Sequence, residues 1–240
     1  MVDGSPQLNK LEIDAQPVTP MRPKKSLGRP KSGSTEKTRE RILFEAERLF
    51  AEGGYDGTSI RNVAKASGLQ IQAIGYHFGN KESLFQTVVG RRAEILNAMR
   101  DEALLELRKQ AGDKPIALEA LVRAYVRPFI ASANSDDKGW QNFAALMGRL
   151  ANSPLGTATI SKHYNTVAQT YVDEFQRALK GVDKAAIVNG VMFMVASMLW
   201  ICSDTGRSSE LTGSRATDME SDYEHLVNYT VAGFAALGKG

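Results

Sequence analysis

Apolar residues recur at intervals of three and four along most of the chain, and no stretch shows the two-residue alternation of a half-buried strand. The pattern therefore predicts an all-α protein. Glycine, proline and capping residues divide it into helices, which we expect at residues 38–53, 58–66, 69–78, 81–110, 116–133, 140–150, 154–180, 183–204 and 217–237.

The clearest local pattern lies between Thr58 and Phe78, where two short helices are separated by a tight turn. Thr58 stands at the position of an N-cap, and Gly68 suits a turn that needs positive φ. The apolar positions that bring the helices together are Ile60, Val63 and Ala64 in the first and Leu69, Ile74 and Phe78 in the second. A helix-turn-helix that places its second helix in the DNA major groove has this form, and so does an ordinary helical hairpin with a polar outer face.

The outer face of the second helix carries side chains that can read bases. Gln70 and Gln72 can each form two hydrogen bonds with adenine, and Ala73 can contact a thymine methyl group. Tyr76 and His77 lie on the same side and can donate hydrogen bonds.

The flanking helices complete a pattern that resembles the DNA-binding domain of the TetR (tetracycline-repressor) family of bacterial transcription regulators, over residues 38–89. The matching residues are Arg41, Ile42, Leu43, Leu49, Phe50, Gly54, Tyr55, Thr58, Ser59, Ile60, Val63, Ala64, Gly68, Leu69, Tyr76, His77, Phe78, Asn80, Lys81, Glu82, Ser83 and Leu84. The chain departs from the family at Gln70, where Ser is commoner, and at Gly75, where Tyr is commoner, so Tyr76 takes over the expected phosphate contact. The DNA-binding residues expected in this domain are Thr58, Ser59, Arg61, Gln70, Gln72, Ala73, Tyr76, His77 and Lys81.

Basic residues are concentrated just before this domain. Residues 22–41 hold eight Lys and Arg against two Glu, whereas the rest of the chain holds 22 basic and 25 acidic residues. Residues 1–33 also contain five prolines, which predicts a disordered arm. Its Gly-Arg-Pro core resembles an AT-hook that lies in a minor groove, and a solvated tail is the alternative. The arm residues expected to contact DNA are Lys24, Lys25, Arg29 and Lys31.

Proline and glycine set the expected boundaries in the rest of the chain. Gly112 should end the long helix, Pro115 should begin the next, and Pro128 should kink or end it. Residues 204–216 are expected to form a loop, and Thr217 should open the last helix as a capping box with Glu220.

Residues 185–202 are apolar on nearly every side and reach the minimum length of a membrane span. A buried core helix or a subunit interface requires the same composition, and we expect no membrane insertion. The resemblance implies a homodimer that pairs the last two long helices, although both helices could simply complete the monomer core. The interface residues expected from the small and large positions are Gly190, Phe193, Ala196, Ser197, Trp200, Leu226, Thr230 and Phe234.

The resemblance also implies an effector pocket in the C-terminal helices, and their aromatic, Met and Arg content favours an apolar or amphipathic ligand with one polar or anionic end. The expected lining residues are Arg123, Tyr125, Phe129, Trp140, Phe143, Met147, Arg149, His163, Tyr164, Met194 and Met198. The Tyr-His-Phe-Gly sequence at 76–79 is similar to the branch of the family that includes fatty-acyl sensors.

No catalytic, cofactor or metal motif is present: the three His are far apart and no Gly-rich phosphate loop occurs. The single cysteine fits a reducing cytoplasm. We therefore expect a cytoplasmic, ligand-responsive, homodimeric repressor with an arm at 1–33, a helix-turn-helix domain at 34–82 and a ligand-binding and dimerisation domain at 83–240. The alternatives are a DNA-binding protein without an effector and an enzyme whose site the sequence does not reveal.

Overall fold

The computed structural model describes residues 32–151, 153–203, 207–213 and 218–237, and every regular element in these ranges is an α-helix. The all-α prediction is therefore confirmed. The helices are α1 (Ser32–Gly57), α2 (Ile60–Ala66), α3 (Ile71–Phe78), α4 (Lys81–Ala111), α5 (Leu118–Ala133), α6 (Lys138–Leu150), α7 (Pro154–Ala178), α8 (Lys184–Cys202), α9 (Arg207–Thr212) and α10 (Met219–Leu237).

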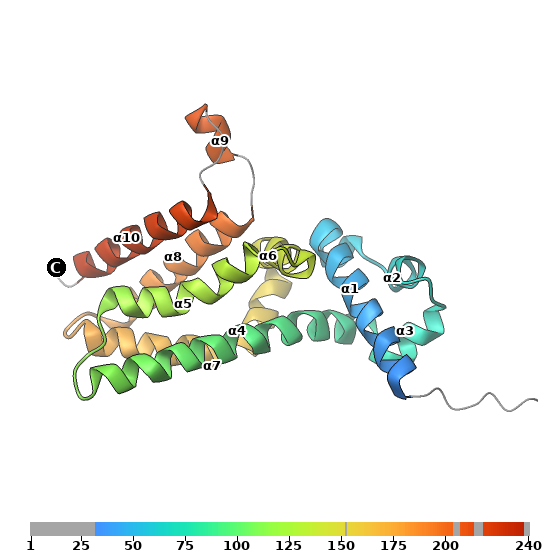
Figure 1. Cartoon of the computed structure of the whole chain (residues 1–240), viewed down its shortest axis with the longest axis horizontal. Helices are drawn as coiled ribbons and strands as arrows, with labels where there is room; N and C mark the ends of the chain where they lie inside the picture. Colours follow the sequence, from blue (N-terminus) through green and yellow to red (C-terminus); the bar gives the residue numbers. More distant parts are fainter. Residues whose placement is uncertain (1–31, 152, 204–206, 214–217, 238–240) are drawn as a thin grey trace, which may run out of the picture.

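Helices α1–α3 form a small head at one end of an elongated helical body made of α4–α10 (Figure 1). Helix α4 begins beside the head and runs along the body, so it belongs to both. Its first turns contribute Phe85 to the head core, where the ring lies edge-on to Phe50 with centroids 5.0 Å apart. The expected division between residues 82 and 83 therefore falls inside the first turn of α4.

The turn glycine between α2 and α3 is as the sequence predicted, but the residue that caps the start of α2 is not. Gly68 has φ of 63°, the left-handed conformation that glycine adopts without strain. The N-cap of α2 is Ser59, whose hydroxyl accepts a hydrogen bond from the Asn62 backbone N–H at 3.1 Å. The expectation that Thr58 caps this helix was therefore wrong by one residue.

Helix boundaries in the body were predicted well where a polar cap precedes the helix. Asn80, Ser153 and Asp183 each accept a hydrogen bond from a backbone N–H in the first turn of α4, α7 and α8, respectively. Gly54 (φ 70°) and Gly112 (φ 58°) break helical geometry where the glycine pattern indicated, although α1 resumes for one short turn after Gly54.

Two boundary predictions were wrong, those for the start of α5 and for the loop at 204–216, and a third falls on a residue outside the described ranges. Helix α5 begins at Leu118 rather than at Pro115, and it continues through Pro128 to Ala133. The expected loop at 204–216 contains the short helix α9. Thr217 lies outside the described residues; Asp218 accepts from the Ser221 backbone N–H at 2.9 Å at the start of α10.

Candidate DNA-binding face and effector cavity

The outer face of α3 is solvent-exposed along the positions that the sequence indicated. Gln70, Gln72 and Tyr76 are exposed, whereas Ala73 and His77 are half-buried. The opposite side of the helix packs into the head core through Ile74 and Phe78, which are both buried. The helix thus presents one polar, accessible face, as a recognition helix requires.

The DNA contacts predicted at and before α2 differ in their exposure to solvent. Ser59, the N-cap of α2, and Arg61 in the first turn of α2 are exposed. Thr58 is buried, and its hydroxyl donates to the carbonyl oxygens of Leu49 and Gly54 at 2.9 Å. Thr58 therefore joins α1 to the start of α2 and cannot itself reach a phosphate.

Two further features of this face were not expected. Ile71, at the start of α3, is exposed although it is apolar, and it stands beside Gln70 and Gln72. The Lys81 ammonium lies 4.1 Å from the centroid of the Tyr55 ring, so its side chain is oriented by a cation–π contact. The predicted arm contacts Lys24, Lys25, Arg29 and Lys31 lie outside the described residues.

The body contains a cavity of about 480 Å³ among α4, α5, α6, α7 and α8. This volume is within the range of small-molecule sites, about 300–1,000 Å³. Five of the eleven residues expected to line an effector pocket do so, namely Tyr125, Phe129, Met147, Tyr164 and Met198. Most of the remaining wall is apolar, with Ile160, Val195 and Leu199 among its residues.

The other apolar residues expected in the pocket lie elsewhere. Phe143 and Met194 are buried in the core beside the cavity and do not line it. Trp140 lies beneath the Arg92 guanidinium, whose central carbon is 4.4 Å from the ring centroid. Helical spacing indicates which residues share a face, but it does not separate packed core from cavity wall.

The charged residues expected in the pocket are also elsewhere. Arg123 points to α10, where it forms two hydrogen bonds of 2.7 and 2.8 Å with the Glu224 carboxylate. Arg149 is exposed on α6, and His163 faces a second cleft. The cation that does line the cavity is Arg100 of α4, which the sequence analysis missed. The sequence does contain a pattern that could have identified it, because Arg100 lies at helical spacing with Ala93, Leu96 and Leu104, which are buried on the same face of α4.

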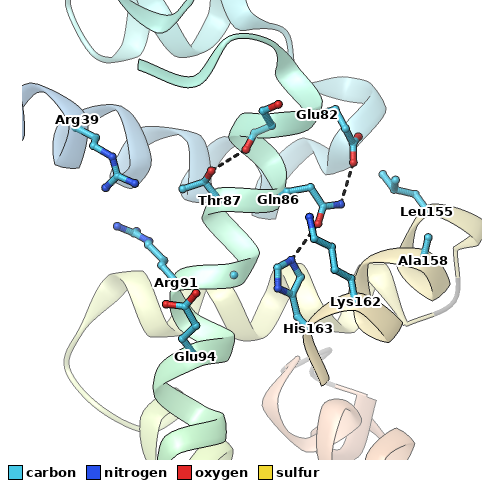
Figure 2. A pocket seen from close by; sticks show the side chains of 12 residues that line it. Arg39, Glu82, Gln86, Thr87, Arg91, Glu94, Leu155, Ala158, Lys162 and His163 are labelled. Carbon is cyan, nitrogen blue, oxygen red and sulfur yellow. Dashed lines mark hydrogen bonds between the residues drawn. The ribbon is translucent and has the colours of Figure 1, made fainter. Parts of the chain in front are cut away.

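The second cleft, of about 740 Å³, lies between the start of α4, the start of α7 and the Arg39 side chain of α1 (Figure 2). The His163 Nε2 lies 3.0 Å from Gln86 Oε1, and the Gln86 amide donates to Glu82 at 2.8 Å (Figure 2). The Gln86 amide also donates to Thr159 on α7 at 3.1 Å, so this network ties the head end of α4 to α7.

A buried carboxylate joins the head to the body. Glu47 of α1 has no exposed surface, and its carboxylate accepts hydrogen bonds from Arg91 and from Arg92 Nε, the latter at 3.0 Å. Arg92 also covers Trp140 of α6 and lies 3.5 Å from the Asp137 carboxylate. Three helices, α1, α4 and α6, therefore meet around one carboxylate, and α6 continues from there to the cavity wall at Met147.

Large apolar side chains are exposed on α8 and α10, and we call them the exposed stripe. Phe193 is 69% exposed, Trp200 50% and Tyr229 74%. The expected interface residues Phe193, Ala196 and Trp200 are exposed and Ser197 is half-buried. Helix α8 is long and apolar enough to cross a membrane by composition alone, and 33% of its most apolar window is buried within the chain.

The rest of the expected interface belongs to the chain's own core. Phe234 is buried and stacks on Phe175 with ring centroids 4.5 Å apart. Gly190 lies against the Phe234 ring, which a Cβ at Gly190 would meet at 2.6 Å. Leu226 and Thr230 are buried as well, so the side of α10 that carries these residues faces inward. The exposed side of α8 and α10 instead adds Met192 and Tyr229, which the sequence analysis did not assign to the interface.

The cavity wall and the exposed stripe share residues. Met192, Ala196 and Trp200 of α8 line the cavity and are also exposed to solvent. A molecule in the cavity would therefore contact the same helix that presents the apolar stripe. This geometry, together with the accessible α3 and the ion pairs between head and body, defines a helix-turn-helix transcriptional regulator with a ligand-sized cavity.

Comparison with known proteins identifies the family. The model "Bacterial regulatory proteins, tetR family" matches residues 42–88, and the model "Tetracyclin repressor-like, C-terminal domain" matches residues 123–233. Together these matches cover more than half of the chain, which belongs to the TetR family of transcription regulators, as its head sequence indicated.

The similar curated proteins are named as repressors. The HTH-type transcriptional repressor AcnR of Corynebacterium glutamicum is 41% identical over 64 residues, which are 25% of this chain and 34% of AcnR. The negative transcriptional regulator IcaR of the biofilm operon in Staphylococcus aureus is 34% identical over 59 residues, 25% of this chain and 32% of IcaR. The chain thus spans about a third of the length of these relatives.

Solved structures share the whole fold. PfmR of Thermus thermophilus, a TetR family regulator, superposes with a TM-score of 0.54 at 22% identity over 82% of this chain and 95% of PfmR. GusR of Salmonella enterica gives a TM-score of 0.55 at 23% identity over 83% of this chain and 96% of GusR. At these identities the likeness establishes the fold alone.

Proposed function

We propose that this protein is a homodimeric repressor that binds a pseudo-palindromic operator through α3 and leaves it when an apolar or amphipathic molecule occupies the body cavity. The observation that carries the proposal is the sharing of Met192, Ala196 and Trp200 between the cavity wall and the exposed stripe of α8. Because the same helix lines the cavity and presents the stripe, a ligand can alter how two subunits pair.

DNA recognition rests on the exposed face of α3. Gln70 and Gln72 are placed to reach base edges, and Tyr76 and Arg61 are placed to reach phosphates. Two subunits related by a twofold axis would present their α3 helices about 34–36 Å apart, or at a multiple of that distance, to successive major grooves. The names of AcnR and IcaR support repression over activation.

Dimerisation through the exposed stripe of α8 and α10 explains why large apolar side chains remain on the surface of a single chain. Contiguous exposed apolar surface of this kind marks an interaction site. A membrane-spanning role for α8 is the alternative, but a span would have to leave the bundle that α8 forms with α10 and α6. A dimer in the cytoplasm, where the operator DNA lies, requires no such rearrangement.

The effector response follows from linkage. A ligand weakens DNA binding only if it binds more tightly to a dimer geometry that fits the operator poorly. Occupancy of the cavity would displace α6 or α8, and α6 reaches the head through Trp140, Arg92 and Glu47. The distance between the two α3 helices would change as a result.

The proposal is tested by selecting binding sites from a random duplex pool with the full chain. We expect enrichment of a pseudo-palindrome bound by two chains, as measured by sedimentation of the complex. A thermal-shift panel of apolar, polar and nucleotide compounds then tests the effector. A compound at 100 times its dissociation constant should stabilise the dimer by about 2.7 kcal/mol.

Two other results would point to the alternative functions. Operator binding that no cavity ligand alters would leave a DNA-binding protein without an effector. Failure to enrich any sequence, together with turnover of a compound from the panel, would favour an enzyme.

A further inference from the structure

Arg100 is a buried cation on the wall of the body cavity. Its side chain is among the largest fully buried ones, with 2% of the residue exposed. The guanidinium carbon lies 4.1 Å from the Tyr125 ring centroid and 5.9 Å from that of Tyr164, and Nε donates to the Tyr125 carbonyl oxygen at 2.9 Å. Within the described ranges, no Asp or Glu forms an ion pair with Arg100. A buried charge without a counter-charge is costly, so its presence needs an explanation.

A second polar group without a partner lies beside it. The Tyr164 hydroxyl is buried and has no hydrogen-bond partner among the described residues. Burial raises the pKa of Tyr164, so the phenol keeps its proton and can donate. Tyr171 is different, because its hydroxyl donates to the Arg100 carbonyl oxygen at 2.9 Å. The cavity wall thus holds a cation with no carboxylate partner among the described residues, and a hydroxyl donor with no acceptor there.

Most of the rest of the wall is apolar, and its other polar residues are the uncharged Thr157, Ser161, Asn165 and Ser203. Phe129, Met147 and Met198 line the cavity, and none of the residues that line it is an Asp or a Glu. This lining favours a ligand with an anionic end that offers two acceptor oxygens and with an apolar remainder. A carboxylate has this geometry, since one oxygen can accept from the guanidinium and the other from a hydroxyl.

We propose that the cavity binds an amphipathic carboxylic acid, with its carboxylate between Arg100 and Tyr164 and its apolar part against Phe129 and Met198. The proposal deepens the proposed effector site and rests on the proposed function only for the consequence on DNA. A neutral molecule of the same shape leaves the charge of Arg100 uncompensated, and an organic cation is repelled by it.

The test compares decanoate with 1-decanol by calorimetric titration of the full chain. The alcohol is the more apolar of the two, so a site that selected by apolar contact alone would prefer it. We expect decanoate to bind at least about tenfold more tightly, the difference typical of one charge-assisted hydrogen bond. The same comparison of 2-naphthoate with 2-naphthol distinguishes an aromatic acid from an alkanoic one, and a preference for either acid over its neutral partner supports the carboxylate.

Three variants test which residues cause the preference for the acid over the alcohol. Arg100→Met should remove the preference for the acid and should leave the melting temperature of the ligand-free protein equal or higher, because an unpaired buried charge is replaced by an apolar side chain. Tyr164→Phe should weaken decanoate binding with little change in melting temperature, since its hydroxyl has no partner to lose. Tyr171→Phe is the matched control, and it should lower the melting temperature while the preference for the acid persists.

Equal affinities for each acid and its neutral partner, or binding of neither, would overturn the proposal. So would an unchanged preference in both Arg100→Met and Tyr164→Phe, the result expected if these residues only pack the core. These outcomes are independent of DNA. If decanoate binds through Arg100 but leaves operator affinity unchanged, the carboxylate site stands and the proposed effector response fails.

Discussion

Gln72 tests DNA reading at the scale of single residues, because its exposed side chain lies in the middle of the outer face of α3. We expect Gln72→Ala to weaken binding to the selected operator by about 1–3 kcal/mol, the usual contribution of a bidentate base contact. Binding to random duplex depends on phosphate contacts and should change little. Fluorescence anisotropy with both duplexes measures the two affinities.

The matched control is Gln176→Ala, the same chemical change at an exposed position of α7 far along the chain from α3. It should leave both affinities unchanged. Equal losses on operator and random DNA in Gln72→Ala would show that Gln72 does not read a base.

The stability of the folded chain should depend on pH through His163, and the surroundings of its ring determine the sign of that dependence. Burial and the neighbouring charge of Lys162 lower the pKa of His163 below its ordinary value of 6.5, and Glu94 opposes this shift. The unfolded chain therefore binds a proton near pH 6.5 that the folded chain does not bind. Stability is full above that pH and falls as the pH drops toward the lowered pKa.

We accordingly expect the melting temperature to fall less between pH 7.5 and pH 5.5 in His163→Gln than in the wild-type chain. Thermal melts at both pH values, recorded without DNA, provide the comparison. An identical decrease in the two proteins would mean that other groups account for the acid sensitivity.

The orientation of some single residues could be predicted from the sequence, whereas that of others could not. The exposure of Gln70, Gln72 and Tyr76 was predictable, because the apolar positions of α3 leave one polar face. The inward orientation of Phe234 was not, since α10 is apolar on two sides and only the packing with Phe175 shows which side is buried. Arg100 was missed because the arginines expected in the pocket were Arg123 and Arg149, and only the packing of α4 shows that Arg100 lines the cavity instead.

At the scale of helices, the ion pairs around Glu47 connect head and body. Replacing Glu47 by Gln keeps its shape but removes the charge that Arg91 and Arg92 share. We expect the free energy of unfolding to fall by about 1–3 kcal/mol, less than the ~3–5 kcal/mol for a fully buried pair, because both arginines keep other partners. Urea denaturation measures the loss.

A double-mutant cycle with Arg92→Gln tests whether the pair itself is responsible. The combined variant should lose less than the sum of the single variants, because the second change removes an arginine that has already lost its partner. Additive losses would show that Glu47 and Arg92 contribute independently.

Helix boundaries were predictable where a capping side chain or a positive-φ glycine marks them, as at Asn80, Ser153 and Gly112. They were not predictable where tertiary packing decides. Pro115 is compatible with a helix start, yet α5 begins three residues later at Leu118. Helix α5, which packs against α4, α6 and α10, continues through Pro128, where the sequence predicted a kink or an end.

At the scale of the whole molecule, the proposed dimer pairs through the exposed stripe of α8 and α10. We expect Phe193→Glu combined with Tyr229→Glu to yield monomers, because two charges would be buried in each half of the interface. Leu105→Glu, on the exposed side of α4, is the control and should remain dimeric.

Sedimentation equilibrium at micromolar concentration distinguishes these states. The monomeric variant should retain its helical circular dichroism, since both replaced side chains are exposed in the single chain, and it should bind the operator poorly. A wild-type chain that is monomeric at micromolar concentration would contradict the dimer altogether.

The division into a DNA-binding head and a helical body followed from the sequence, because the head carries residues at fixed spacing. The position of the cavity did not, since it depends on how α4, α6, α7 and α8 cross. The link between the cavity and the proposed dimer surface emerges only from the structure, which shows that Met192, Ala196 and Trp200 both line the cavity and are exposed.

The most direct test of the central claim is the affinity of the full-length dimer for its selected operator, measured by anisotropy at increasing concentrations of a cavity ligand such as decanoate. The account predicts that the dissociation constant rises and then reaches a plateau, because the ligand shifts the dimer between two geometries of unequal affinity for DNA. An operator affinity that stays constant while calorimetry shows the cavity to be saturated would contradict it.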